Sequence, residues 1–151
     1  MTRKRTFERH ESLGYMVNLE ARMLALALHR RIALHGVVPG QFPALLALYE
    51  RDGRTQAELC REVQIEQPTM ANTLRRMERD GLVRRQSDTE DGRRQLIFLT
   101  PRAISLRTKL VAAARAVNDA ATRGLTEREV TRTLSTIRRV VENLGAELDR
   151  P

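Results

Sequence analysis

The feature that most limits the fold of this 151-residue chain is a close succession of two short helix patterns between residues 55 and 80. Thr55-Gln56-Ala57-Glu58 has the spacing of a capping box, in which the Thr hydroxyl and the Glu carboxylate each accept a backbone N–H of the other residue. A helix is therefore predicted from there to about residue 63. A brief connection leads to Gln67-Pro68, where proline suits a first helical turn, so a second helix is predicted to run to Asp80.

A pattern of two β-strands follows directly. Residues 82–86 and 95–99 are short strand-like segments, and the polar, turn-rich residues 87–92 lie between them, so a β-hairpin is predicted. A short helix, a tight connection, a second helix and a β-hairpin in this order are typical of the winged helix-turn-helix, whose second helix presents a polar face to the major groove of DNA.

The rest of the chain is predicted to be helical. Apolar residues at spacings of three and four continue from Leu13 to about residue 34, where Gly36 and the turn at Pro39-Gly40 interrupt them. Further helices are predicted at residues 41–51, at 101–121 after an N-cap at Thr100, and from a second capping box at Thr126–Glu129 to about residue 148.

These patterns define a fold class: mainly α with a small β-hairpin wing, a winged helix-turn-helix with a helical dimerisation region. Aromatic residues make up 3% of the chain and Trp is absent, so the core is expected to be aliphatic. We expect a single domain over residues 1–151. Within it, residues of about 41–100 form the DNA-binding lobe, and residues of about 10–35 and 101–150 form the dimerisation region.

The formal net charge of +8 favours an anionic partner. Residues 54–94 contain nine arginines and eight acidic residues, a net charge of only +1, so the arrangement of the arginines must carry any contact with DNA. An arginine-rich coding bias is the alternative explanation of the overall charge.

The second helix of the pair has two different faces. Met70, Leu74 and Met77 form an apolar stripe that is expected to face inward. Gln, Asn and Arg can form paired hydrogen bonds to base edges, and Thr can contact a phosphate or a thymine methyl group. An ordinary solvated helix would also be polar outside, and that alternative stays open. The predicted DNA-contacting residues of this helix are Gln67, Pro68, Thr69, Asn72, Thr73 and Arg76.

The tip of the predicted hairpin carries two further candidates. Arg93 and Arg94 project from a short turn and suit contact with phosphate or with the minor groove, whose negative potential favours arginine. Asp88 or Asp91 can orient one of them through a salt bridge.

At this point the sequence resembles the MarR family of bacterial regulators. Residues 68–83, PTMANTLRRMERDGLV, resemble the recognition helix of that family and its exit, and residues 88–94, DTEDGRR, continuing to Leu99-Thr100, resemble its wing. Glu90 and Ala103 depart from the family pattern, which often has Arg and Gly at these positions. Glu90 removes one possible phosphate contact, so Arg93 and Arg94 are expected to supply the contacts of the wing. The resemblance covers nearly the whole chain.

The resemblance implies a two-fold dimer in which the first, fifth and sixth helices of both chains interlock. The residues support this independently, because the long apolar first helix and an apolar seam on the last helix exceed what one small winged lobe can cover. Packing within one subunit is the alternative. The seam consists of Leu134, Ile137, Val141, Leu144 and Leu148.

The resemblance also implies a small-ligand pocket between the dimer core and the DNA-binding lobe. Apolar and aromatic residues where the first two helices meet are the candidate lining, and Arg22 or His29 can pair with a carboxylate or phosphate. A small aromatic acid is the leading ligand and its coenzyme A thioester the alternative; these residues can also be simple core. The candidates are Tyr15, Met16, Leu19, Arg22, Met23, Phe42, Leu46 and Tyr49.

Other classes of function are disfavoured. His10, His29 and His35 fit no metal pattern, and we find no phosphate loop or nucleophile elbow, so we expect no enzyme, no metal and no cofactor. A winged-helix module that binds protein instead of nucleic acid is the rival, and it would be favoured by an acidic or apolar recognition face. Cys60 is expected to be a packing residue, although a regulator that responds to oxidation is an alternative.

The expected location is the cytoplasm. One cysteine permits no intramolecular disulfide, the basic start at residues 1–9 is not followed by a signal-type apolar stretch, and residues 23–28, the longest apolar run, are too short for a bilayer. The charged residues 1–10 are expected to fray. The predicted function is therefore a sequence-specific, double-stranded-DNA-binding homodimer that acts on a pseudo-palindromic operator, a repressor released by its ligand.

Overall fold

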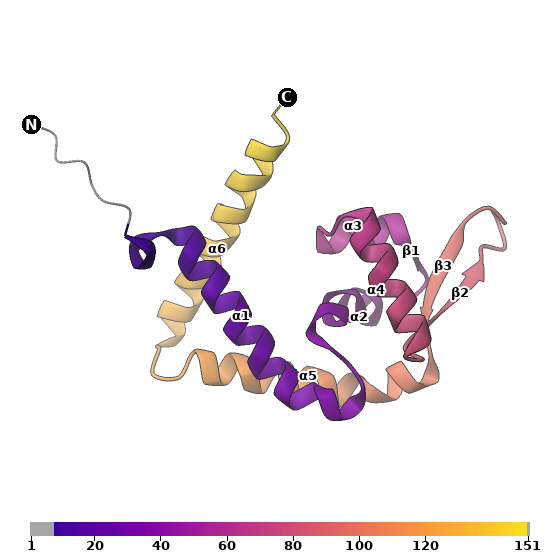
Figure 1. Cartoon of the computed structure of the whole chain (residues 1–151), viewed down its shortest axis with the longest axis horizontal. Coiled ribbons are helices and arrows are strands. Elements are labelled where there is room, and N and C mark those ends of the chain that lie inside the picture. Colours follow the sequence, from indigo (N-terminus) through magenta and orange to yellow (C-terminus); the bar gives the residue numbers. More distant parts are fainter. Residues whose placement is uncertain (1–7, 151) are drawn as a thin grey trace, which may run out of the picture. The chain divides into compact units, whose positions relative to one another are not determined.

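The computed structural model of the protein describes residues 8–150 (Figure 1), and these divide into two compact units between Val117 and Asn118. The helices and strands follow the predicted order, and the predicted fold class is confirmed. The elements are α1 (Leu13–Ile32), α2 (Phe42–Glu50), β1 (Arg54–Thr55), α3 (Gln56–Val63), α4 (Gln67–Arg79), β2 (Val83–Ser87), β3 (Gln95–Leu99), α5 (Pro101–Ala121) and α6 (Glu127–Leu148), with 3-10 turns at Arg9–Glu11, Ala33–His35 and Pro39–Gln41.

The sheet of the first unit has three antiparallel strands in the order β1-β3-β2, not two. The predicted hairpin is present, with Val83 opposite Leu99 and Ser87 opposite Gln95. The additional strand β1 consists of two residues, and Arg54 pairs with Ile97. A strand this short leaves no alternation in the sequence to detect, but it ties the start of α3 to the hairpin.

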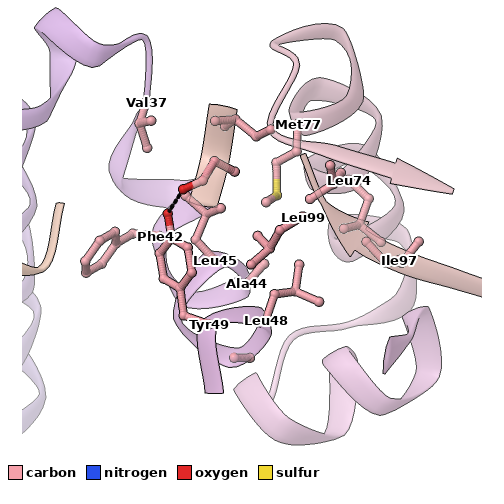
Figure 2. Packing of buried hydrophobic residues seen from close by; sticks show 14 of the residues in the cluster. Val37, Phe42, Ala44, Leu45, Leu48, Tyr49, Leu74, Met77, Ile97 and Leu99 are labelled. Atoms are coloured by element: carbon pink, nitrogen blue, oxygen red, sulfur yellow. Dashed lines mark hydrogen bonds between the residues drawn. The ribbon is translucent and has the colours of Figure 1, made fainter. Parts of the chain in front are cut away.

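The core of the first unit is mostly aliphatic, as expected, with Phe42 and Tyr49 as its aromatic members, and it is built mainly by the lobe (Figure 2). The apolar stripe of α4 faces inward as predicted, because Met70, Leu74 and Met77 are fully buried. Leu45 and Leu48 of α2 are almost completely buried beside them. This packing fixes which side of α4 stays outside.

The ends of α1 and α5 are joined to this core. Ile32, the last residue of α1, and Ala103 and Leu110 of α5 are fully buried in it. The Thr100 hydroxyl accepts from the Ala103 N–H at 3.2 Å, which confirms the predicted N-cap of α5. Ala103, one of the two departures from the family pattern, therefore fits without exposure.

The start of the chain differs from the expectation in part. Residues 1–7 lie outside the described residues, and so does most of the basic segment 1–9. Arg9 and His10 lie in a 3-10 turn and contact Tyr15: the Arg9 guanidinium is 5.8 Å from the centre of its ring, and the His10 ring lies edge-on at 5.5 Å. These two residues are therefore placed, not frayed.

The second unit contains the end of α5 and the whole of α6. The capping box at its start is confirmed, because the Thr126 Oγ1 accepts from the Glu129 N–H at 3.3 Å and the Glu129 carboxylate accepts from the Thr126 N–H at 2.7 Å. None of the residues described for α6 is buried.

No single helix among the described residues is long and apolar enough to cross a membrane. One pair bent by 91°, Leu13–His35 with Pro39–Glu50, reaches that length and apolarity only when the two parts are taken together.

Candidate nucleic-acid interface

The start of α3 is held by the capping box predicted from the sequence. The Thr55 Oγ1 accepts from the Glu58 N–H at 3.2 Å, and the Glu58 Oε2 accepts from the Thr55 N–H at 2.7 Å. The backbone hydrogen bond from Thr55 and the side-chain hydrogen bond from Arg51 together lower the pKa of Glu58 to about 2. The connection to α4 turns at Gln64, a non-glycine residue with a φ of 52°, in the left-handed region.

The outer face of α4 carries the residues predicted to contact DNA. Thr73 is half-buried beside the apolar stripe, whereas the others are exposed: Gln67, Pro68, Thr69, Asn72 and Arg76. The structure therefore brings all six onto the side of the helix that the core leaves open, and their contact with DNA stays a prediction.

Sequence reasoning missed Arg75 on the same helix. This side chain is exposed, and its Nη1 donates to the Asn72 Oδ1 at 2.7 Å. The signal was present, because residues three apart on a helix are neighbours. Arg75 adds a second guanidinium beside Arg76 on the outer side of α4.

The side chain of Gln56 was also missed. Its Nε2 donates to the Gln67 Oε1 at 2.9 Å and lies 3.5 Å from the main-chain carbonyl oxygen of Gln67. Gln56 thus joins the first turn of α3 to the first turn of α4. This hydrogen bond holds the side chain of Gln67, the first residue on the outer face of α4.

The wing places its two predicted arginines at an ordered tip. Arg93 and Arg94 are both exposed. Arg94 forms a salt bridge with Asp88 at 3.7 Å, as expected for one of the two aspartates, while Asp91 accepts from the Arg93 N–H at 3.1 Å. Glu90 donates its N–H to Asp88 at 3.0 Å, so this departure from the family pattern supports the turn.

Two more arginines line the wing, and neither was singled out in the sequence. Arg84 stacks its guanidinium 5.0 Å from the centre of the Phe98 ring, on the opposite strand. Arg85 pairs with Glu78 of α4 at 3.0 Å and so couples β2 to the recognition helix. Figure 1 shows α4 beside the hairpin, with the hairpin tip extending beyond the helix.

Arg54 has a different task from the other arginines of residues 54–94. Arg54 is only 8% exposed. Its Nε donates to the carbonyl oxygens of Ala47 and Arg51 at the end of α2, both at 3.2 Å. Its Nη1 lies 3.3 Å from the Glu62 carboxylate. This arginine stabilises a helix end, so it adds no charge to the outer surface.

The end of α4 is fixed by a polar cluster at Asp80. Arg79 and Gln41 donate to its carboxylate at 2.9 and 2.8 Å, and these hydrogen bonds, Arg79 first, lower the pKa of Asp80. Arg102 of α5 donates to the carbonyl oxygens of Asp80 and His35 at 2.9 and 2.6 Å. Helix α4 is thereby bonded to the 3-10 turn that follows α1 and to the first turn of α5.

The residues predicted to bind a ligand fall into two groups. Tyr15 lies in the first turn of α1, whereas Phe42 and Tyr49 are buried in the core that receives the other end of α1 through Ile32. About 25 Å of helix separates Tyr15 from Ile32 at 1.5 Å per residue. Of the remaining candidates, Leu19 is half-buried, and Met16, Arg22, Met23 and Leu46 are exposed.

The hydroxyl group of Tyr49 already forms a hydrogen bond within the protein. Its hydroxyl donates to the Ala103 carbonyl oxygen at 2.7 Å, and burial raises the pKa of this hydroxyl (Figure 2). Ala103 stands 54 positions further along the chain, so no local pattern could have indicated this bond.

Cys60 lies half-buried in α3 and packs against the core. Burial is the main reason that the pKa of the Cys60 thiol is raised, which leaves less of the reactive thiolate at neutral pH.

The MarR family model matches residues 35–94, which extend from the end of the 3-10 turn after α1 to the wing tip. The HTH-type transcriptional regulator YwoH of Bacillus subtilis is 31% identical over 91 residues, or 60% of this chain and 66% of YwoH. The chain spans between half and two thirds of the length of the first curated relatives that it matches.

Solved structures extend the similarity to nearly the whole chain. The transcriptional regulator PA3341 is 33% identical, with 89% of this chain and 99% of that chain covered at a TM-score of 0.76. For the MarR transcriptional regulator of Methanosarcina mazei Go1 the identity is 25%, the coverage 90% and 97%, and the TM-score 0.80. AbfR bound to DNA and PcaV of Streptomyces coelicolor with its natural ligand share the fold at 20% and 23% identity, with TM-scores of 0.75 and 0.82. The chain therefore belongs to the MarR family of transcriptional regulators.

Proposed function

We propose that this protein is a dimeric, sequence-specific regulator that binds double-stranded DNA in the cytoplasm and represses until a small ligand releases it. One observation carries the proposal: the outer face of α4 and the arginine-tipped wing belong to one lobe and are joined by the Arg85–Glu78 pair. A helix with a polar outer face suits the major groove, and arginine at a hairpin tip suits the adjacent minor groove. We assign the chain no enzymatic role.

The arrangement of charge supports nucleic acid over a protein partner. The exposed guanidinium groups of Arg75, Arg76, Arg93 and Arg94 lie on α4 and the wing tip, while Arg54 is withdrawn into the lobe. Within α4, the one acidic side chain, Glu78, is paired with Arg85. The recognition surface is therefore polar and cationic, as contact with phosphates requires.

The apolar seam of α6 supports the dimer. Its five residues, Leu134, Ile137, Val141, Leu144 and Leu148, are between 39% and 84% exposed in the single chain. Apolar side chains of α1 are uncovered as well, with Leu13 60% and Met23 59% exposed. Exposed apolar surface of this extent marks an interaction site. A two-fold dimer would present two copies of α4 to half-sites about 34–36 Å apart.

The proposed function includes a small ligand that binds near α1 and releases the DNA. The uncovered side chains of α1, including Met16, Arg22 and Met23, offer apolar contact and one cation, which suits a small aromatic acid or its coenzyme A thioester. A ligand can release DNA only if it binds better to the conformation whose recognition helices do not fit the operator. Titration of operator binding with aromatic acids and their thioesters, repeated on Tyr15→Ala and Arg22→Ala, tests this; no shift with any compound contradicts ligand control here.

The decisive experiment for the function is selection of bound DNA from a random pool by the full-length protein. We expect an enriched pseudo-palindrome, and affinity that falls steeply between low and moderate salt through release of counterions. Asn72→Ala or Arg76→Ala should weaken binding to the selected site by roughly 1–3 kcal/mol, with less effect on random DNA. Recovery of no DNA above background contradicts the proposed function.

A further inference from the structure

Both side-chain amides on the outer side of α4 have their oxygen atom hydrogen-bonded to another side chain of the protein. The Gln67 Oε1 accepts from Gln56 at 2.9 Å, and the Asn72 Oδ1 accepts from Arg75 at 2.7 Å. Gln67, Asn72 and Arg75 are exposed, so the remaining atoms of these amides face solvent. The two amides are therefore held by the same kind of contact.

The chemistry of the partners settles which end of each amide points outward. A guanidinium group only donates, so the atom of Asn72 that faces Arg75 must be the oxygen. Gln56 places the same Nε2 near the main-chain carbonyl oxygen of Gln67, which only accepts. Gln56 is thus the donor in this pair, and the Gln67 atom that it meets must also be oxygen.

The outward-facing groups of α4 are consequently hydrogen-bond donors. The NH2 groups of Gln67 and Asn72 remain free to donate, and Arg75 and Arg76 have no acceptor atom at all. Glu78, the acidic residue within α4, is bonded to Arg85. The hydroxyls of Thr69 and Thr73 can accept on this side, whereas the oxygens of both amides are turned toward donors of the protein.

We infer that the recognition helix selects base edges that carry acceptors, and therefore guanine at the positions that Gln67 and Asn72 contact. This inference rests on the proposed binding of double-stranded DNA. Guanine presents two acceptors in the major groove, N7 and O6, whereas thymine presents only O4 beside its methyl group and adenine presents N7 beside a donor. Guanine therefore offers the most partners to NH2 groups that donate. The familiar pairing of Gln or Asn with adenine needs the oxygen and the NH2 group of one amide to face the same base. Here each oxygen is turned toward Gln56 or Arg75, so the NH2 group is the end of the amide that faces outward.

Gln56 and Arg75 are thus positioning residues for specificity, although they need not touch a base themselves. The inference refines what residue types alone suggest, because the sequence indicates paired hydrogen bonds for Gln67 and Asn72. The hydrogen bonds within the protein change the group that each residue offers.

The test is a matched pair of substitutions at Gln56, each used in selection from a random DNA pool. Gln56→Lys still donates to the Gln67 oxygen, so guanine should stay preferred. Gln56→Glu can only accept, so Gln67 must turn its NH2 group inward and present its oxygen to DNA. At the position that responds to Gln67→Ala, preference should move from guanine to a base with a donor, cytosine or adenine, by at least about fivefold.

A parallel pair tests Asn72 independently. Arg75→Lys keeps a donor for the Asn72 oxygen and should keep guanine at the position that responds to Asn72→Ala. Arg75→Ala frees that oxygen and should allow adenine there, with a gain of at least about fivefold over guanine. Thermal unfolding of all four variants should match the wild type, since these side chains are on the surface.

The outcomes separate this inference from the function on which it rests. If the wild type enriches no DNA, the proposed function fails. If it enriches a site but adenine, cytosine or thymine occupies the positions that depend on Gln67 and Asn72, the inference alone is wrong. It is also wrong if guanine persists in both Gln56→Glu and Arg75→Ala.

Discussion

Helices α4 and α6 carry the same kind of apolar stripe, but the stripe of α4 is buried and that of α6 is exposed. In α4, Met70, Leu74 and Met77 are fully buried against the lobe. In α6, Ile137 and Val141 are 39% and 47% exposed, and no described residue of the helix is buried. An apolar stripe thus predicts that a face will be covered, but not whether the same chain supplies the cover.

The difference separates two sources of stability. The stripe of α4 is satisfied within one chain, so its contribution should not depend on protein concentration. The stripe of α6 is exposed in the single chain, and under the proposed assembly its contribution grows with concentration, as it does for any dimer.

The largest effect is expected from a charge in the seam of α6. Ile137→Asp combined with Val141→Asp would place two carboxylates in an apolar interface, and we expect the dimer to dissociate completely at micromolar concentration. Analytical ultracentrifugation measures this. Ser135→Asp, at the same helix but outside the apolar seam, is the control and should remain dimeric. A folded wild-type monomer at micromolar concentration would refute the assembly.

The next largest effect is expected in the stripe of α4. Leu74→Ala removes a fully buried side chain and should lower the free energy of unfolding by about 2–5 kcal/mol. Urea denaturation at two protein concentrations measures it, and the loss should be the same at both. Thr69→Ala, on the exposed side of α4, should change stability by less than about 0.5 kcal/mol. A loss that grew on dilution would mean that the α4 stripe, too, belongs to an interface.

A smaller effect, on DNA affinity, is expected to distinguish the exposed arginines of the wing from an exposed arginine of α6. Arg93→Ala or Arg94→Ala should weaken binding to the selected site and to random DNA alike, and should make the salt slope shallower by about one per lost phosphate contact. Arg139→Ala on α6 is the control and should leave the slope unchanged. Fluorescence anisotropy across a salt series gives the slopes. Unchanged slopes in both wing variants would remove the wing from the DNA interface.

The smallest effect compares the two capping boxes as the pH falls. Glu58 has a pKa of about 2, below its ordinary value of 4.5, so folding favours its ionised form. Its contribution is complete above about pH 4.5 and is lost as the pH falls toward 2. Glu58→Gln should therefore flatten this part of the stability curve, measured by urea denaturation at each pH.

Glu129 provides the matched case in α6. The backbone hydrogen bond from Thr126 also lowers the pKa of Glu129, but Arg51 adds a side-chain hydrogen bond only to Glu58. Glu129→Gln should flatten the curve less than Glu58→Gln does. Equal effects would show that Arg51 contributes nothing to the capping of α3.

Much of the fold could be predicted from the sequence because its signals are local. The capping boxes depend on residues three positions apart and the hairpin on two neighbouring segments joined by a short turn, and each forms where it was predicted. Strand β1 could not be predicted in this way. Its pairing depends on β3, about 40 positions away, and on Gly53, whose φ of 71° brings its backbone against the Phe98 ring.

The candidate site could be predicted as a set of residues but not as a set of chemical groups. The spacing on α4 indicated which side chains face outward, and their exposure agrees with that. It did not indicate that Gln56 and Arg75 engage the amide oxygens, or that Arg54 is withdrawn to the end of α2. Each of these depends on where a hydrogen-bond partner lies in three dimensions.

The contact between Arg102 and the ends of α1 and α4 has a consequence for how the sequence can evolve. Because Arg102 donates to the main-chain carbonyl oxygens of His35 and Asp80, this contact itself requires no particular side chain at those two positions. Gly36 is not free, since its φ is 69° and a Cβ there would lie 2.9 Å from the Arg102 Nη2. Positions 36 and 102 should therefore covary among relatives: where a side chain replaces the glycine, the arginine loses its place.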